Sequence, residues 1–239
     1  MNQELKNKRM NELISLFTKG QIDQCLSQAK KALKVYPDEP FLFNLLGITY
    51  AAKSLFAEAI NYYEKAISLS PSYFEVFNNM GVAYNDWKKP KKAINSLNKA
   101  IELNPGYAEA FNNLGNAQKE LLNFDDAERS YQKAIDLAPT YADALCNLGI
   151  CLSLQEKYED AEVLYKKALA INPENIRYSL LVSNVLIKQK NYKEGFAIAN
   201  QIANENPNNY EALYIAGISS KGLNQLDLAE KFFRKSLSI

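Results

Sequence analysis

The stretch AEAFNNLGNAQKELLNFDDAERSYQKAIDLAPTY, residues 108–141, decides the fold because its pattern returns along most of the chain. Its glycine, Gly115, stands at position 8 of the stretch and its proline, Pro139, at position 32. The same 34-residue spacing holds for Pro37, Pro71, Pro105, Pro173, Pro207, Gly47, Gly81, Gly149 and Gly217. A fixed period of this length predicts stacked helix–turn–helix units.

Setting each proline at position 32 divides the chain into seven units: 6–39, 40–73, 74–107, 108–141, 142–175, 176–209 and the shorter 210–239. In each unit, positions 4, 7, 8 and 11 form one helical stripe, and positions 20, 24, 27 and 28 form a second. Small residues at positions 8, 20 and 27 let the two helices approach, and larger residues fill the remaining space. The sequence therefore predicts an all-α fold of stacked antiparallel helix pairs.

The sixth unit fits this pattern least well. Ser179 and Ser183 take the places of a large and a small residue on its first helix. Gly195 and Ala199 give its second helix smaller side chains at positions 20 and 24 than most other units have.

Composition excludes several classes of protein. The chain has 239 residues, a formal net charge of +1 and no histidine, so the commonest general base and metal ligand are missing. No nucleotide-binding or calcium-binding motif occurs, and no apolar run is long enough for a membrane span. Three cysteines without a C-x-x-C pair favour a reducing compartment. We expect a cytoplasmic, non-catalytic protein with no cofactor, no metal, and no nucleic-acid or membrane partner.

The repeat resembles the tetratricopeptide repeat (TPR) family over nearly the whole chain. The resemblance implies a right-handed superhelical α-solenoid, with residues 1–239 as a single domain. It also implies that the first helix of each unit, here called helix A, lines a concave wall. The second helix of each unit is called helix B.

Positions 2, 5, 6, 9, 12 and 13 of helix A lie opposite its core stripe, which makes them the candidate binding surface. From this set we choose Glu75, Asn78, Asn79, Glu109, Asn112, Asn113, Asn116, Asp143, Asn147 and Asn184 as candidate partner-binding residues. The centre of the surface is rich in asparagine, and its two ends are apolar. An asparagine amide offers one acceptor and two donors, which suits the backbone of an extended peptide.

At position 6 this asparagine ladder resembles the helical domain of O-GlcNAc transferases. Asn79, Asn113 and Asn147 match that pattern, and three other units depart from it, with Leu45, Leu181 and Ile215. The alternative is that asparagine is simply a common polar residue on an exposed repeat face. On the ladder hypothesis, replacing the three asparagines with alanine leaves the fold intact and weakens partner binding.

The two ends of the repeat array differ. Arg9 and Glu12 give the first unit a polar outer face, as a terminal cap needs. The sequence predicts no capping helix after the last unit, so Phe233, Leu237 and Ile239 should be exposed.

Three functions remain open. The first is a protein–protein interaction scaffold that binds an extended segment in the helix-A groove. The second is the recruiting arm of a larger enzyme, with a catalytic domain like those of glycosyltransferases, sulfotransferases or oxygenases beyond Ile239. The third is a self-assembling scaffold, a homo-oligomer formed through the uncapped C-terminal helix.

Overall fold

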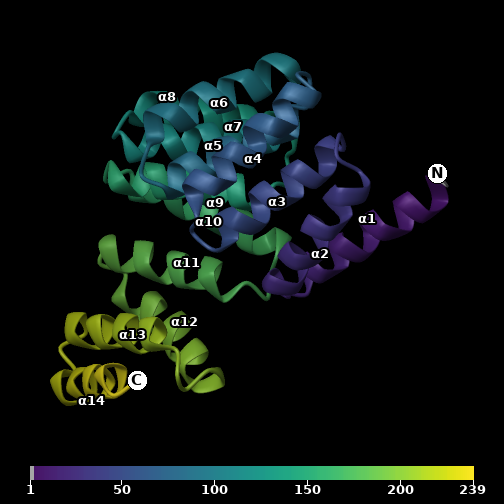
Figure 1. The fold of residues 1–239 in the computed structure, drawn as a ribbon. Helices are drawn as coiled ribbons and strands as arrows, with labels where there is room; N and C mark the ends of the chain where they lie inside the picture. Colours follow the sequence, from purple (N-terminus) through teal and green to yellow (C-terminus); the bar gives the residue numbers. More distant parts are fainter. Residues whose placement is uncertain (1–2) are drawn as a thin grey trace. The chain divides into compact units, whose positions relative to one another are not determined.

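The computed structural model describes residues 3–239, and this part of the chain contains fourteen helices and no strand (Figure 1). The helices are α1 (Gln3–Thr18), α2 (Ile22–Val35), α3 (Pro40–Ala52), α4 (Phe56–Leu69), α5 (Phe74–Asp86), α6 (Pro90–Leu103), α7 (Ala108–Glu120), α8 (Phe124–Leu137), α9 (Ala142–Leu154), α10 (Tyr158–Ile171), α11 (Ile176–Lys188), α12 (Tyr192–Glu205), α13 (Tyr210–Gly222) and α14 (Leu226–Leu237). Each predicted repeat holds one helix A and one helix B. The all-α solenoid of helix pairs is confirmed.

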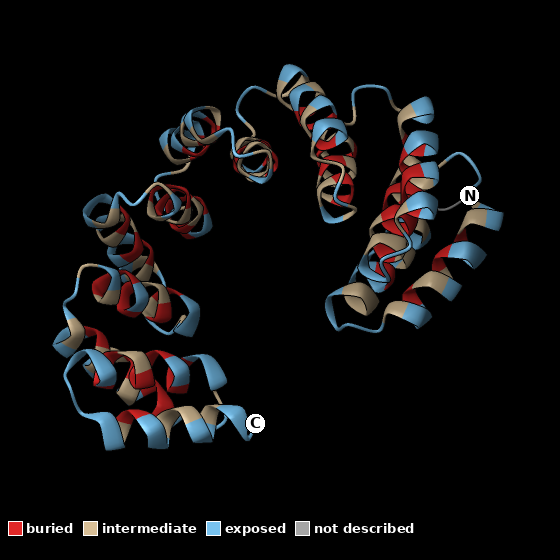
Figure 2. Cartoon of the chain, turned by 90° about the vertical axis from the view of Figure 1, so that its left-hand side faces the viewer, coloured by how far each residue is buried: buried red, intermediate tan, exposed pale blue. Residues whose placement is uncertain are grey.

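The chain divides into two compact units, Met1–Asn123 and Phe124–Ile239. The first unit contains α1 to α7, and the second contains α8 to α14. In each unit the buried residues lie on the helix faces that meet a neighbouring helix (Figure 2). The single continuous domain expected for residues 1–239 stays a prediction.

The turn from helix A to helix B places one residue of every repeat in the left-handed region. At position 15, Ser54, Lys88, Leu122, Glu156, Lys190 and Asn224 have φ between 58° and 64°. Only the first repeat uses glycine there, Gly20 with φ of 72°. Leu55 N donates to Tyr50 O at 3.0 Å, as a left-handed helix end requires. Sequence reasoning missed this turn because no glycine marks it.

Glycine at position 8 lets the large residue at position 24 lie against the backbone of helix A. A Cβ atom on Gly47 would lie 2.3 Å from the Tyr63 ring, and one on Gly149 would lie 2.6 Å from the Tyr165 ring. Both tyrosines are almost fully buried. Burial raises the pKa of both phenols above their usual value. The predicted pairing of small and large residues is therefore the packing rule of this core.

The sixth repeat has different residues at positions 8 and 24. Ser183 stands at position 8, where glycine is usual, and the small Ala199 stands at position 24, where most repeats have a large side chain. Its hydroxyl donates to Gly195 O at 2.6 Å, and the Ser183 side chain is fully buried. A Cβ on Gly195 would lie 3.1 Å from Ser183 O, so helix B needs glycine here to approach. A close backbone approach and a hydrogen bond thus join the two helices of this repeat, where other repeats use a ring.

The two end repeats differ in their exposed residues. Arg9 donates to Gln28 of α2 at 2.5 Å and pairs with Glu12 at 3.2 Å, while Leu5 and Ile14 of α1 are exposed. On α14, Leu237 is 88% exposed and Ile239 after it is 57% exposed. Phe233 is only half-buried, although its ring lies against Gly217.

Candidate partner-binding surface

In the first compact unit, the asparagines join one repeat to the next. Asn79 Nδ2 donates to Asn44 Oδ1 at 3.0 Å, and Asn113 Nδ2 donates to Asn78 Oδ1 at 2.9 Å. Both bonds run from position 6 of one repeat to position 5 of the repeat before it. The double asparagine thus forms a hydrogen bond across the repeat junction.

Position 5 is buried, which corrects the prediction that both asparagines of each pair face away from the core. Asn78 is 0% exposed and Asn112 is 4% exposed. The helices A of neighbouring repeats contact each other directly, α3 with α5 and α5 with α7. Position 5 lies towards this contact, whereas the prediction considered only the packing of helix A on helix B.

A carboxylate and a tyrosine complete the junction. Asn78 Nδ2 also donates to Glu109 Oε1 at 3.0 Å, and the Tyr107 hydroxyl donates to Glu109 Oε2 at 2.9 Å. One repeat earlier, Tyr73 hydrogen-bonds Asn44; its pKa is raised by burial first and by Glu75 second. The acidic residue at position 2 therefore orders the junction as well as charging the surface.

These bonds also correct the expected effect of the alanine substitutions. Removing the Asn79 or Asn113 amide deletes a bond between repeats. The acceptors on Asn44 and Asn78 are then left buried with one partner fewer, which costs free energy. The gain in helix propensity from alanine is smaller, about 0.6 kcal/mol.

The candidate residues differ in exposure. Asn78 and Asn112 are buried; Glu75, Asn79, Asn113, Asn116 and Asn147 are half-buried; Glu109, Asp143 and Asn184 are exposed. In the first unit, Asn79 and Asn113 each donate to the preceding repeat, and Asn113 Oδ1 also accepts from Asn112 Nδ2 at 3.5 Å. The asparagine at position 6 is thus the more exposed one of each pair.

In the second unit, a tyrosine and an arginine contact the acidic residue at position 2. The Tyr178 hydroxyl donates to Asp143 Oδ1 at 2.7 Å, and Arg177 lies 3.9 Å from the same oxygen. Burial, followed by the hydrogen bond to Asp143, raises the pKa of Tyr178 to about 12. The phenol therefore remains a donor throughout the neutral range.

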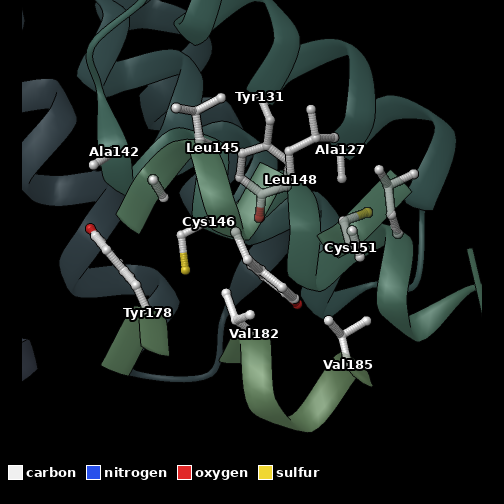
Figure 3. Close-up of a cluster of buried hydrophobic side chains, with 14 of the residues drawn as sticks. Ala127, Tyr131, Ala142, Leu145, Cys146, Leu148, Cys151, Tyr178, Val182 and Val185 are labelled. Atoms are coloured by element: carbon white, nitrogen blue, oxygen red, sulfur yellow. The ribbon is translucent and has the colours of Figure 1, made fainter. Parts of the chain in front are cut away.

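Cys146 occupies position 5 in this unit and is fully buried. Figure 3 shows it among the buried side chains of α9 and α11, near Tyr178 and Val182. Position 5 is thus buried in this repeat as well, as at Asn78. Cys25 is buried too, as expected of a cysteine in a small-residue position.

The helix-A side of the second unit contains a small apolar hollow. Its volume is about 170 Å³, and its lining residues are Ile150, Ser153, Leu154, Tyr165, Leu181, Asn184, Val185 and Lys188. Most of these stand at positions 6, 9, 12 and 13, so the sequence placed them on the binding surface. It did not show that they enclose a hollow, because the hollow needs residues from three helices.

Within residues 3–239, no cluster of three or more His, Cys, Asp or Glu side chains has the arrangement of a metal site. None of the described helices is both long and apolar enough to cross a membrane. The chemistry of the surface is therefore that of amides, carboxylates and apolar side chains.

Comparison with protein families decides the class of repeat. A tetratricopeptide repeat model matches residues 74–107, 108–141 and 142–175, and a TPR repeat model matches residues 55–86. The chain belongs to the TPR family. Three of the matched ranges coincide with units predicted from the proline spacing. TPR units are protein-interaction modules, so the chain is an interaction scaffold of this class.

No curated protein sequence matches the chain. Among solved structures, PilF of Pseudomonas aeruginosa is 19% identical, with 88% of this chain and 96% of that chain covered and a TM-score of 0.74. This likeness shows the fold alone. MamA is 28% identical over 74% of this TPR chain and 97% of its own, with a TM-score of 0.57.

YrrB, described as a TPR protein with an unusual peptide-binding site, is 25% identical. The alignment covers 71% of this chain and 88% of YrrB, with a TM-score of 0.54. The resemblance of the asparagine ladder to O-GlcNAc transferases stays a prediction.

Proposed function

We propose that this TPR chain is a non-catalytic scaffold that binds an extended peptide or protein segment along its helix-A surface. The observation that carries the proposal is the pair of half-buried amides, Asn79 and Asn113, fixed one repeat apart by bonds to the preceding repeat. Their remaining amide atoms suit the backbone of an extended segment. Because their rotamers are already fixed, binding loses little side-chain entropy.

Sequence and comparison support the same function. YrrB, a TPR protein described as having a peptide-binding site, shares the fold over most of its length. The three cysteines of the described chain are buried and form no disulfide, which fits a reducing compartment, so we propose that the scaffold is cytoplasmic. A net charge of +1 gives no reason to propose a nucleic-acid or membrane partner.

A random-peptide library selected on the full chain tests this function. Val82→Glu places a charge beside the asparagines on α5, where Val82 is half-buried at position 9. We expect it to weaken the selected peptides by roughly tenfold or more, the effect of about 1.4 kcal/mol. Fluorescence anisotropy with labelled peptides measures the change.

Asn98→Glu is the matched control, because Asn98 is exposed on α6, the helix B of the same repeat. It adds the same charge on the other helix and should leave affinity unchanged. If Asn98→Glu weakens binding and Val82→Glu does not, the partner lies on helix B and the proposal is wrong.

Self-assembly is a second candidate function, favoured by the apolar exposure of α14. Leu226 is 62% exposed and Leu237 is 88% exposed. Sedimentation velocity at two protein concentrations, with Leu237→Lys as the variant, tests it. The third candidate, a recruiting arm of an enzyme, is tested by reading the gene beyond Ile239.

A further inference from the structure

The apolar hollow on the helix-A side of the second compact unit has the size of one side chain. At about 170 Å³ it is smaller than the roughly 300–1,000 Å³ of pockets that hold drug-sized ligands. Ile150 and Leu154 of α9 form one wall, and Leu181 of α11 contributes to the other. Val185, almost fully buried and visible in Figure 3, belongs to the lining. A branched aliphatic side chain fits this lining better than a ring or a charged group.

The polar groups of the hollow are few. Ser153 hydrogen-bonds the Tyr165 hydroxyl, so these two groups satisfy each other. Asn184 and Lys188 remain; both are exposed at positions 9 and 13 of α11. They offer an amide and a cation to whatever enters.

Charge decides which partner suits the hollow. Lys188 forms no ion pair with any residue in the described range, and no carboxylate lines the hollow. Asp143 of the candidate surface is at the opposite end of α9, where Tyr178 and Arg177 contact it. Glu162 of α10 contacts Gln189, the neighbour of Lys188, but pairs with Lys166 at 2.6 Å. A negative group beside the hollow would therefore meet Lys188 without a competing carboxylate.

We propose that this hollow binds a branched aliphatic side chain of an extended peptide whose neighbouring residue is acidic, with the acidic group held by Lys188. The proposal rests on the proposed function and gives that function a side-chain preference. Burial of the aliphatic group supplies the affinity, and the charge supplies the preference.

Methyl-selective NMR of the full chain tests the preference with three capped peptides. They are acetyl-Gly-Ser-Leu-Asp-Ser-Gly-amide and two relatives, one with Lys in place of Asp and one with Lys in place of Leu. We expect the first peptide to shift the methyl signals of Ile150, Leu154, Leu181 and Val185. The peptide with Lys in place of Asp should bind up to about fivefold more weakly, since one exposed ion pair is worth up to about 1 kcal/mol. The peptide with Lys in place of Leu should bind more weakly still, since it leaves no aliphatic group for the hollow.

Three variants locate the effect. Lys188→Glu should reverse the preference between Asp and Lys in the peptide. Leu154→Gln should abolish binding, because it removes an apolar wall of the hollow. The fold should remain intact, because Leu154 is 58% exposed. Lys193→Glu is the matched control: Lys193 is exposed on α12 and does not line the hollow. It should bind all three peptides as the parent chain does.

Several results would overturn the inference. Equal binding of the Asp and Lys peptides would show that Lys188 does not select an acidic residue. If none of the four methyl signals shifts, the hollow is not the binding site. Shifts at these residues that depend on protein concentration, without peptide, mean that a second copy covers the hollow. If Val82→Glu weakens the library peptides but no peptide shifts the methyl signals of the hollow, this inference is wrong and the proposed function stands.

Discussion

The helix-A surfaces of the two compact units use different chemistry on the same repeat. In the first unit, positions 5 and 6 meet through amides, as Asn113 does with Asn78. In the second unit, the corresponding residues of the last junction are Leu180 and Ile215, both buried in one apolar cluster. A 34-residue period thus fixes where repeats touch and leaves open how they touch.

The difference teaches what each junction demands. An amide pair is directional, so both partners must be present and correctly placed. An apolar junction requires only matched volume, which lets the second unit keep a hollow between α9 and α11. The same scaffold thus carries a polar surface, which we propose binds peptide backbone, and an apolar surface, which we propose binds a side chain.

Exchanging the two junction chemistries should have the largest effect. Leu180→Asn buries an amide opposite Ile215, where no polar partner stands, and removes apolar contacts. We expect a loss of about 3–5 kcal/mol in the free energy of unfolding. Urea denaturation measures it. The reverse change, Asn78→Leu, should cost less, about 1–3 kcal/mol, because its former partners are nearer to water. Equal costs would show that the two junctions are interchangeable.

The rule shared by both units, glycine facing a large residue, should come next. Gly149→Ser places atoms against the buried Tyr165 ring and should destabilise the chain by about 1–3 kcal/mol. Gly106→Ser is the control, since a Cβ there meets only Asn104 Oδ1 at 3.5 Å. Combining Gly149→Ser with Tyr165→Ala reproduces the serine and alanine of the sixth repeat. Thermal unfolding should show the double variant more stable than the sum of the single changes predicts.

The asparagine bond of the first unit should give a smaller change. Asn113→Ala removes the donor to Asn78 Oδ1, and we expect a loss of about 1 kcal/mol, the usual net value of one hydrogen bond. Asn98→Ala, exposed on α6, is the control and should be neutral or slightly stabilising. If both variants behave alike in urea denaturation, the amide bond contributes nothing.

The tyrosine junction of the second unit should give the stability a pH dependence in the alkaline range. Tyr178 keeps its proton to a pKa of about 12 when folded, against about 10 for an unfolded tyrosine. Its contribution to stability is therefore complete below about pH 10 and is lost as the pH rises from there through about 12, because the unfolded chain deprotonates first. Tyr178→Phe should make the alkaline fall in the urea midpoint shallower, and an unchanged slope would contradict the assignment.

Much of the fold was readable from residues with a fixed period. Pro71 and Pro105 set the unit boundaries, and Gly47 with Tyr63 gave the pairing of small and large residues. The left-handed turn was not readable, because Leu122 and its equivalents are ordinary residues held there by hydrogen bonds at the helix end.

The sequence by itself determined the repeat length, the helix pairs and the polar or apolar character of each junction, because these depend on residue type and spacing. Tertiary structure alone decided which asparagine of a pair is buried. Asn78 and Asn79 are neighbours on α5, yet the contact of α5 with α7 accompanies full burial of Asn78, whereas Asn79 stays half-buried. A helical pattern describes one helix against its core, whereas the second contact surface exists only once the repeats are stacked.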